Sequence, residues 1–226
     1  MFWLIPTASA NTFMPPAATA VAQKVNSLYG FMLVTSLIFF VLLIGGMIYF
    51  VYKYKRKGAD DKTPYITHDH TLEFIWSFVP FVIFMVCFAW GAYVYMEMRT
   101  FDANAMEINV TGKKWVWEFD YKNGKKVMPS VDENGKLVPS TLVVPINVPV
   151  KLVMTSAKVT PDDKAVLHAF YVPAFRVKQD VVPGRYSALT FTAIEKGLFQ
   201  VFCAEFCGTG HSTMMALKHG GSKALL

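Results

Sequence analysis

The sequence predicts a membrane protein built from a hairpin of two transmembrane helices followed by an all-β domain. Three observations lead to this fold class. Charged residues make up only 17% of the 226-residue chain, below the roughly one quarter that soluble domains carry. Two long runs contain no charged side chain, and most of the remainder consists of short β-rich stretches between turn residues. Long apolar runs are typical of membrane spans, and recurring short strands are typical of a sandwich or barrel.

The two charge-free runs are long enough to cross a bilayer. The first covers residues 29–52 and the second covers residues 74–96. A helix rises 1.5 Å per residue, so the first run reaches about 36 Å against a hydrocarbon core of about 30 Å. Pro80 lies early in the second run, where a helix bundle tolerates the loss of one backbone hydrogen bond. We therefore predict transmembrane helices over residues 29–52 and 73–97.

The basic residues beside the spans predict the orientation. Residues 53–72 carry five of them, whereas residues 1–28 carry only Lys24. Because basic residues accumulate on the cytoplasmic side of a membrane, we expect residues 53–72 to form a cytoplasmic loop. The segment 1–28 and the β-rich domain then lie on the outer side. Proximity to a span also explains this basic cluster better than binding to nucleic acid does, and we expect no nucleic-acid partner.

The N-terminal segment contains a short motif, Ala8-Ser9-Ala10, that resembles a signal-peptidase site. The apolar stretch ahead of it has only four residues, whereas a signal peptide needs roughly 7–15. We therefore expect the N-terminus to remain uncleaved.

Residues 105–226 predict one β-rich domain. Turn signals such as Asn134-Gly135 and Pro183-Gly184 separate its strand-like stretches, and the polar stretch 122–139 predicts an exposed hairpin. Several short strands at this spacing favour a sandwich or barrel. The strand-like stretches cover residues 108–110, 115–121, 142–146, 150–155, 166–172, 186–192 and 197–203.

Candidate metal ligands are concentrated near the C-terminus. Cys203 and Cys207 lie four residues apart, and His211 and Met214 follow in the same segment. Thiolate, imidazole and thioether together favour copper, and a mononuclear blue-copper site needs only one cysteine. The second cysteine therefore indicates a second copper, with both thiolates bridging the two ions. That scheme requires another histidine, and His168 in an earlier strand-like stretch is the candidate.

Two other interpretations of the cysteines stay open at this point. In an oxidising compartment Cys203 and Cys207 could form a disulfide, which would leave His211 and Met214 without a role. A structural zinc site would use cysteine and histidine but would not need the thioether of Met214. The remaining histidine of this part of the chain, His219, lies in a polar tail, and we expect it to be solvated.

The segment Cys203 to Met214, with His168 upstream and two spans ahead, resembles subunit II of the haem–copper cytochrome c oxidases. The resemblance implies a cupredoxin-like Greek-key sandwich that carries a binuclear copper centre. The implied function is to accept electrons from a cytochrome c and to pass them to haem in subunit I, where oxygen is reduced to water. The implied copper ligands are His168, Cys203, Cys207, His211, Met214 and the backbone carbonyl of Glu205.

The resemblance also assigns roles to three other side chains. Trp115 matches the tryptophan that receives electrons from cytochrome c, and strand alternation would place it on one face with Trp117, Phe119 and Tyr121. Glu73 matches a glutamate near the mouth of a proton pathway into subunit I, although it could also be an ordinary acid at a helix start. The carboxylate of Glu205 matches a ligand of a magnesium or manganese ion shared with subunit I.

The motifs that the chain has and lacks bear on alternative functions and on the expected partners. A quinol-oxidase subunit II shares the fold but lacks the copper ligands, and an independent copper carrier or nitrous-oxide-reducing enzyme would not need the two spans. No histidine lies in either charge-free run and no Cys-x-x-Cys-His motif occurs. The oxygen-reducing haem must therefore belong to another chain, and we expect subunit I and subunit III as partners. The expected location is a bacterial plasma membrane rather than a mitochondrial inner membrane.

The charge of the outer domain bears on the electron donor. From Glu97 onward the chain has 16 basic and 12 acidic residues, and Lys113 and Lys114 precede Trp115. Subunits that dock a basic cytochrome c usually present an acidic patch at this place. We therefore expect a donor that is acidic or that is held in a supercomplex.

Overall fold

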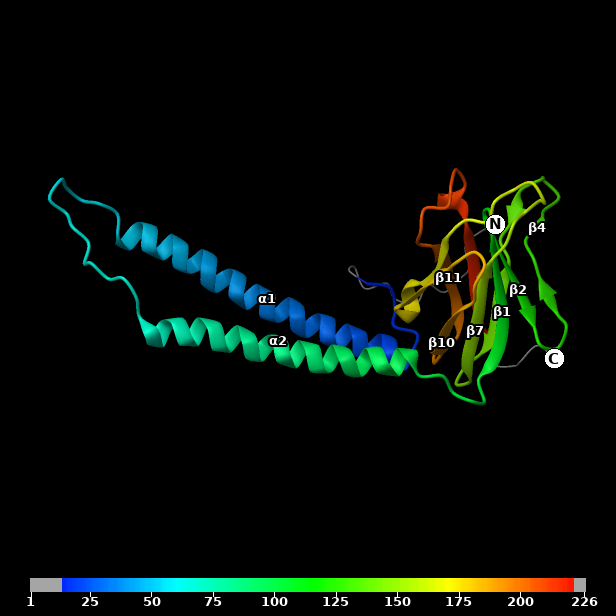
Figure 1. Cartoon of the computed structure of the whole chain (residues 1–226), viewed down its shortest axis with the longest axis horizontal. Helices are drawn as coiled ribbons and strands as arrows, with labels where there is room; N and C mark the ends of the chain where they lie inside the picture. Colours follow the sequence, from blue (N-terminus) through cyan, green and yellow to red (C-terminus); the bar gives the residue numbers. More distant parts are fainter. Residues whose placement is uncertain (1–13, 222–226) are drawn as a thin grey trace. The chain divides into compact units, whose positions relative to one another are not determined.

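The computed structural model describes residues 14–221, with side chains described as far as Leu217. Two long helices precede a domain of strands (Figure 1). The chain divides into two compact units. Residues 26–94 form one unit, and the residues up to Val25 join those from Tyr95 onward in the other.

The two helices extend beyond the charge-free runs. Helix α1 spans Ala20–Lys53 and helix α2 spans His70–Arg99. Each has a side-chain cap at its start: Thr19 Oγ1 accepts a hydrogen bond from the Ala22 N–H at 3.0 Å, and Asp69 Oδ1 accepts one from the Leu72 N–H at 3.1 Å. Such caps pair N–H groups that have no partner within the helix, so the helices begin at the caps rather than at the first apolar residue.

The helices form an antiparallel hairpin (Figure 1) in which the Phe31 and Trp90 rings lie 5.9 Å apart. Both are long and apolar enough to cross a membrane. Large apolar side chains point outward from both, including Leu43 and Phe84, which are 64% and 71% exposed. Such surfaces are costly in water and suited to lipid, so the hairpin is a membrane anchor, as predicted.

The strands form two five-stranded sheets and one separate hairpin. The first sheet has the order β10-β7-β1-β2-β3, the second has the order β6-β12-β11-β8-β9, and β4 pairs with β5. The pairs β1–β7 and β6–β12 are parallel and the others antiparallel. The bounds are β1 Met106–Lys113, β2 Val116–Tyr121, β3 Lys126–Val127, β4 Ser130–Val131, β5 Leu137–Val138, β6 Thr141–Pro145, β7 Pro149–Ser156, β8 His168–Val172, β9 Val177–Val181, β10 Ser187–Thr192, β11 Gly197–Cys203 and β12 Met215–Gly221.

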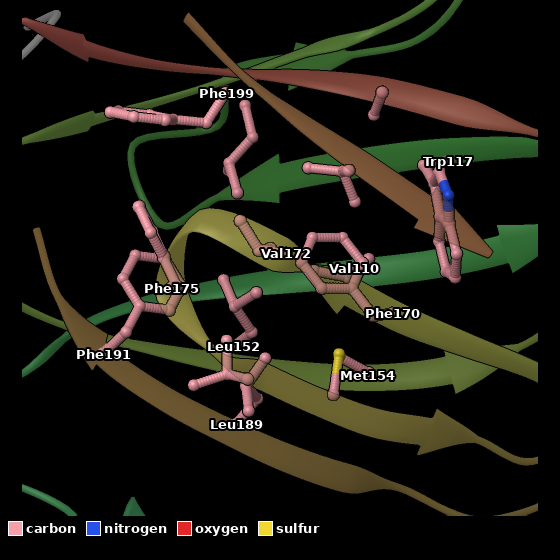
Figure 2. Close-up of a cluster of buried hydrophobic side chains, with 14 of the residues drawn as sticks. Val110, Trp117, Leu152, Met154, Phe170, Val172, Phe175, Leu189, Phe191 and Phe199 are labelled. Carbon is pink, nitrogen blue, oxygen red and sulfur yellow. The ribbon is translucent and has the colours of Figure 1, made fainter. Parts of the chain in front are cut away.

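The core lies between the inner faces of the two sheets. Alternate residues of β7 are buried, as expected of a strand with one face toward a core. Figure 2 shows Trp117, Phe170 and Phe175 among the aliphatic side chains of this core. The Trp117 and Phe170 rings meet edge to face at 5.1 Å, so side chains from both sheets interlock. The all-β sandwich is confirmed.

The segment before α1 is part of the β unit. The Ala18 N–H donates to the Ala174 carbonyl and the Ala18 carbonyl accepts from the Ile194 N–H, both at 2.9 Å. Thr19 also forms a β-bridge with Ala193. The described part of the N-terminal segment, which we expected on the outer side over residues 1–28, is therefore tied into the sandwich just ahead of α1. The motif Ala8-Ser9-Ala10 lies outside the described residues.

Two strands, β9 and β12, were not predicted. Strand β12 lies inside the second sheet, where its backbone pairs with β11 on one side and with β6 on the other. The interpretation of this stretch as a polar tail around His219 was therefore wrong for its backbone. The glycine and polar residues of β12 have low strand propensity, so the sequence did not predict this strand, and pairing on both sides stabilises it.

Tyr121 joins the two sheets and supplies a test of the fold. Its hydroxyl donates to the Val143 carbonyl at 2.9 Å and accepts from the Val143 N–H at 2.8 Å. Tyr121→Phe leaves both groups of Val143 without this partner, so the free energy of unfolding should fall by about 1–3 kcal/mol. Near-ultraviolet circular dichroism of the detergent-solubilised chain during heating measures the effect.

The matched control is Tyr186→Phe, because Tyr186 is 76% exposed. We expect this variant to unfold at the temperature of the wild type. Equal unfolding temperatures for the Tyr121 and Tyr186 variants would show that the bonds to Val143 add no stability.

Candidate metal centre

The strands β8 and β11 bring distant candidate ligands together. His168 is the first residue of β8 and Cys203 is the last residue of β11. These strands are antiparallel neighbours, with Cys203 opposite Phe170. The remaining candidates lie in the segment that leads from β11 to β12, and they are Cys207, His211 and Met214.

Backbone hydrogen bonds fold this segment back onto the sheet. The Cys203 N–H donates to the Met214 carbonyl at 3.2 Å, and the Ala204 N–H donates to the Ala169 carbonyl at 3.0 Å. A 3₁₀ helix over His211–Thr213 then turns the chain into β12. The first and last candidate ligands of the segment are thereby fixed to each other and to β8.

The donor atoms gather around two sulfur atoms that lie 3.7 Å apart, those of Cys203 and Cys207. The Cys203 Sγ is 3.8 Å from the His168 Nδ1 and 3.2 Å from the carbonyl oxygen of Glu205. The ligand atoms of His168 and the two cysteines all lie within 4.8 Å of one another, a spacing that could hold a metal ion.

The second sulfur has a similar set of neighbours. The Cys207 Sγ is 3.5 Å from the His211 Nδ1 and 3.7 Å from the Met214 Sδ. Met214 is only 1% exposed, so its thioether is held in this position by the core. Each sulfur therefore has one imidazole and one weaker donor beside it.

These distances fit a metal centre. Sulfur and nitrogen ligands that surround one ion tetrahedrally at about 2.0–2.3 Å lie roughly 3.3–3.8 Å from each other. A disulfide would require the two sulfurs to be about 2.05 Å apart, and at 3.7 Å Cys203 and Cys207 are separate thiols. A structural zinc site would leave the buried Met214 thioether without a role. The donor set suits copper better.

Burial keeps two of the candidate ligands, His168 and Cys207, electrically neutral. His168 is fully buried, and desolvation, with smaller contributions from the nearby His211 and Lys114, lowers its pKa to about 4. The imidazole is therefore neutral at pH 7 and retains a lone pair for a metal. Burial, with Cys203 alongside, raises the pKa of the Cys207 thiol to about 12. The thiol must therefore lose a proton when it binds a metal.

Trp115 lies against the ligand segment. Strand β2 begins only at Val116, so Trp115 belongs to the turn after β1 and not to the buried face. The strand alternation that we expected to include Trp115 therefore begins only at Val116: Trp117 and Phe119 are fully buried, whereas Trp115 is partly buried at the margin of the same core. The Trp115 Nε1–H instead donates to the Cys207 carbonyl at 3.2 Å. Sequence periodicity could not reveal this contact, because it joins residues 92 positions apart.

The lysines that precede Trp115 are both paired with acids. Lys113 lies 2.9 Å from Glu118, and Lys114 lies 2.6 Å from Asp163. The expectation of an acidic donor depended on a basic field around Trp115. These ion pairs compensate that field locally, so the count of lysines overstates it.

The two predicted glutamates lie in different settings. Glu73 is in the first turn of α2, half-exposed, with an oxygen 3.7 Å from the His70 Nδ1. Glu205 turns its carbonyl toward Cys203, while its carboxylate lies 3.4 Å from the Lys178 Nζ.

Comparison with known proteins identifies similar chains. The family model described as cytochrome c oxidase subunit II, periplasmic domain, matches residues 106–219, and the model of the transmembrane domain of that subunit matches residues 7–91. Cytochrome c oxidase subunit 2 of Cereibacter sphaeroides is 30% identical, covering 90% of this chain and 74% of that protein. The corresponding subunit of Synechocystis sp. is 27% identical, with coverages of 90% and 70%.

A solved structure is also similar. It is the periplasmic domain of subunit II of cytochrome oxidase of Bradyrhizobium japonicum, which is 31% identical and aligns with a TM-score of 0.46. The alignment covers 54% of this chain and 88% of that one.

Fold and site together define a membrane-anchored electron-transfer subunit with an external cupredoxin-like domain. The chain belongs to the cytochrome c oxidase subunit II family, and its cysteine–histidine group fits the role of receiving electrons for that oxidase. The predicted fold class, family and electron-accepting function are confirmed.

The neutral ligands predict how metal uptake depends on pH. Between pH 6 and 9 the thiol of Cys207 is protonated and must release its proton to the solvent, whereas His168 is already neutral. The apparent affinity of the metal-free chain for Cu(I) should therefore rise with pH, by up to about tenfold per pH unit for each proton displaced. Competition with a chromophoric copper chelator measures it. Cys207→Ser should flatten the dependence, and a wild-type affinity that does not change with pH would contradict the protonated thiol.

Proposed function

We propose that this chain accepts electrons from a cytochrome c at a binuclear copper centre and passes them one at a time to haem in subunit I. One observation carries the proposal: two buried sulfurs lie 3.7 Å apart, each with one imidazole and one weaker donor beside it. Two copper ions that shared the two thiolates would use all six of these donors, whereas a single four-coordinate ion would leave two of them unused. When bound, the copper pair supplies a one-electron redox centre.

The residues of this chain bind the proposed centre and shield it from solvent. The proposed ligands come from the ends of two paired strands and from one hydrogen-bonded segment, so little rearrangement accompanies a change of charge. Trp115 contacts the Cys207 carbonyl and is the proposed site where electrons arrive from the donor. The proposed ligands are His168, Cys203, Cys207, His211, Met214 and the carbonyl of Glu205.

The rest of the reaction takes place on other chains. We propose that subunit I binds the oxygen-reducing haem and that subunit III completes the complex, in a bacterial plasma membrane. The Glu205 carboxylate is a proposed ligand of magnesium or manganese at the boundary with subunit I, where the metal would replace Lys178 as its partner.

The copper proposal predicts about two coppers per chain and a delocalised mixed-valence electron spin resonance signal in the intact oxidase. Replacing either bridging thiol, Cys203→Ser or Cys207→Ser, should abolish that signal, because a hydroxyl does not bridge two coppers as a thiolate does. Metal analysis and spectroscopy of the purified complex measure both. One copper per chain with a blue single-ion spectrum would refute the binuclear centre.

Glu73 is the proposed start of a proton pathway into subunit I. Its place in the first turn of α2, half-exposed beside His70, would let it exchange protons with water. Glu73→Gln should slow turnover and proton delivery while leaving the copper spectrum intact, because the amide keeps the shape of the side chain but cannot carry a proton. His70→Gln tests whether the neighbouring imidazole contributes to turnover and proton delivery. Turnover of Glu73→Gln that matches the wild type at every pH would leave Glu73 as a helix-start acid.

A further inference from the structure

Gly210 lies in the ligand segment between Cys207 and His211, directly against the indole of Trp115. A Cβ atom at this position would lie 2.4 Å from Cδ2, 2.5 Å from Cγ and 2.7 Å from Cε3 of the ring. Real Cβ atoms essentially never approach other heavy atoms within 3.0 Å. Because three atoms of a rigid ring are involved, any side chain at position 210 must displace either the indole or the segment.

The indole also covers Gly208, two residues earlier in the same segment. A Cβ there would lie 3.3 Å from Nε1 and 3.4 Å from Cζ2 of Trp115, and the φ of +115° disfavours a side chain in any case. The Nε1–H of the same ring donates to the Cys207 carbonyl. The ring therefore lies across the backbone of residues 208–210 and is hydrogen-bonded at one end.

This stretch needs external support. Two of the three residues between Cys207 and His211 are glycines, which lose the most conformational freedom on folding. Inside the segment, the His211 N–H donates to the Gly208 carbonyl and the Thr213 N–H donates to the Gly210 carbonyl, at 3.0 and 3.1 Å. These bonds form one turn, but they do not attach it to the rest of the domain. Trp115, which also packs against the core, makes that attachment.

We propose that Gly210 and Trp115 form a positioning pair that holds Cys207 and His211 in a metal-ready arrangement. The missing side chain at position 210 admits the indole, and the indole fixes the segment before any copper binds. This inference rests on the proposed copper function for its spectroscopic consequence. It gives Trp115 a second role, distinct from receiving electrons, and makes Gly210 a positioning residue although it donates no ligand.

The test compares Gly210→Ala with Thr209→Ala in the full chain. Thr209 is exposed, so its variant is the matched control within the same segment. In metal-free protein, Gly210→Ala should make the amide hydrogens of His211 and Thr213 exchange about tenfold faster than in the wild type, because the turn loses its support. Thr209→Ala should leave these rates unchanged.

A double variant separates the contact with the ring from an effect of alanine on the backbone. In the copper-loaded oxidase, Gly210→Ala should change the copper hyperfine pattern of the electron spin resonance spectrum. Adding Trp115→Ala removes the ring, so the double variant should have the spectrum of Trp115→Ala alone. A double variant that keeps the spectrum of Gly210→Ala, or wild-type exchange rates in metal-free Gly210→Ala, would overturn the positioning pair. The wild-type copper content tests the proposed function separately, and the exchange rates do not depend on copper.

Discussion

Strand pairing between β8 and β11 places the two halves of the metal site, because it sets His168 beside Cys203 across 35 residues of sequence. Only two residue pairs join these strands, Phe202 with Tyr171 and Cys203 with Phe170. A slip of one residue would turn Cys203 to the opposite face of the sheet. The ring of Phe170 packs edge to face against the buried Trp117, and this contact stabilises the register of the two strands. The aromatic core therefore fixes the geometry of the site as well as the stability of the sandwich.

Burial sets a second condition on the same site. A charged imidazole or thiolate without a partner is expensive in an apolar interior, and both His168 and Cys207 avoid that charge through shifts in pKa. The ligands can therefore be assembled by the fold with no metal present. A metal that bound there would replace the proton of a Cys207 thiol that is already in place, so folding has ordered this part of the site in advance. The support that Trp115 gives to the glycine-rich turn also orders the site before a metal binds.

The parts of the fold that depend on local sequence were predictable. Charge-free runs define the anchor, and alternation defines strands such as β7, because each pattern reflects which side of one element meets water. The parts that depend on distant partners were not. Strand β12 forms because β6 and β11 lie on either side of it. The segment around Ala18 joins the sandwich through backbone bonds to Ala174 and Ile194, which are far from it in the sequence. Neither stretch carries a periodic pattern, so composition could not reveal them.

The metal site, too, has features that the local sequence predicts and features that depend on distant residues. The spacing of Cys203, Cys207, His211 and Met214 is local, and it is sufficient by itself to indicate a metal site. The surroundings of Trp115 are not local. Counting Lys113 and Lys114 suggested a basic field, but each of these lysines forms an ion pair with an acid. A net charge adds residues without regard to position, whereas a docking partner senses the potential that is left after neighbouring charges have compensated each other. For this domain, the field around Trp115 must therefore be judged from the ion pairs and not from the excess of basic residues.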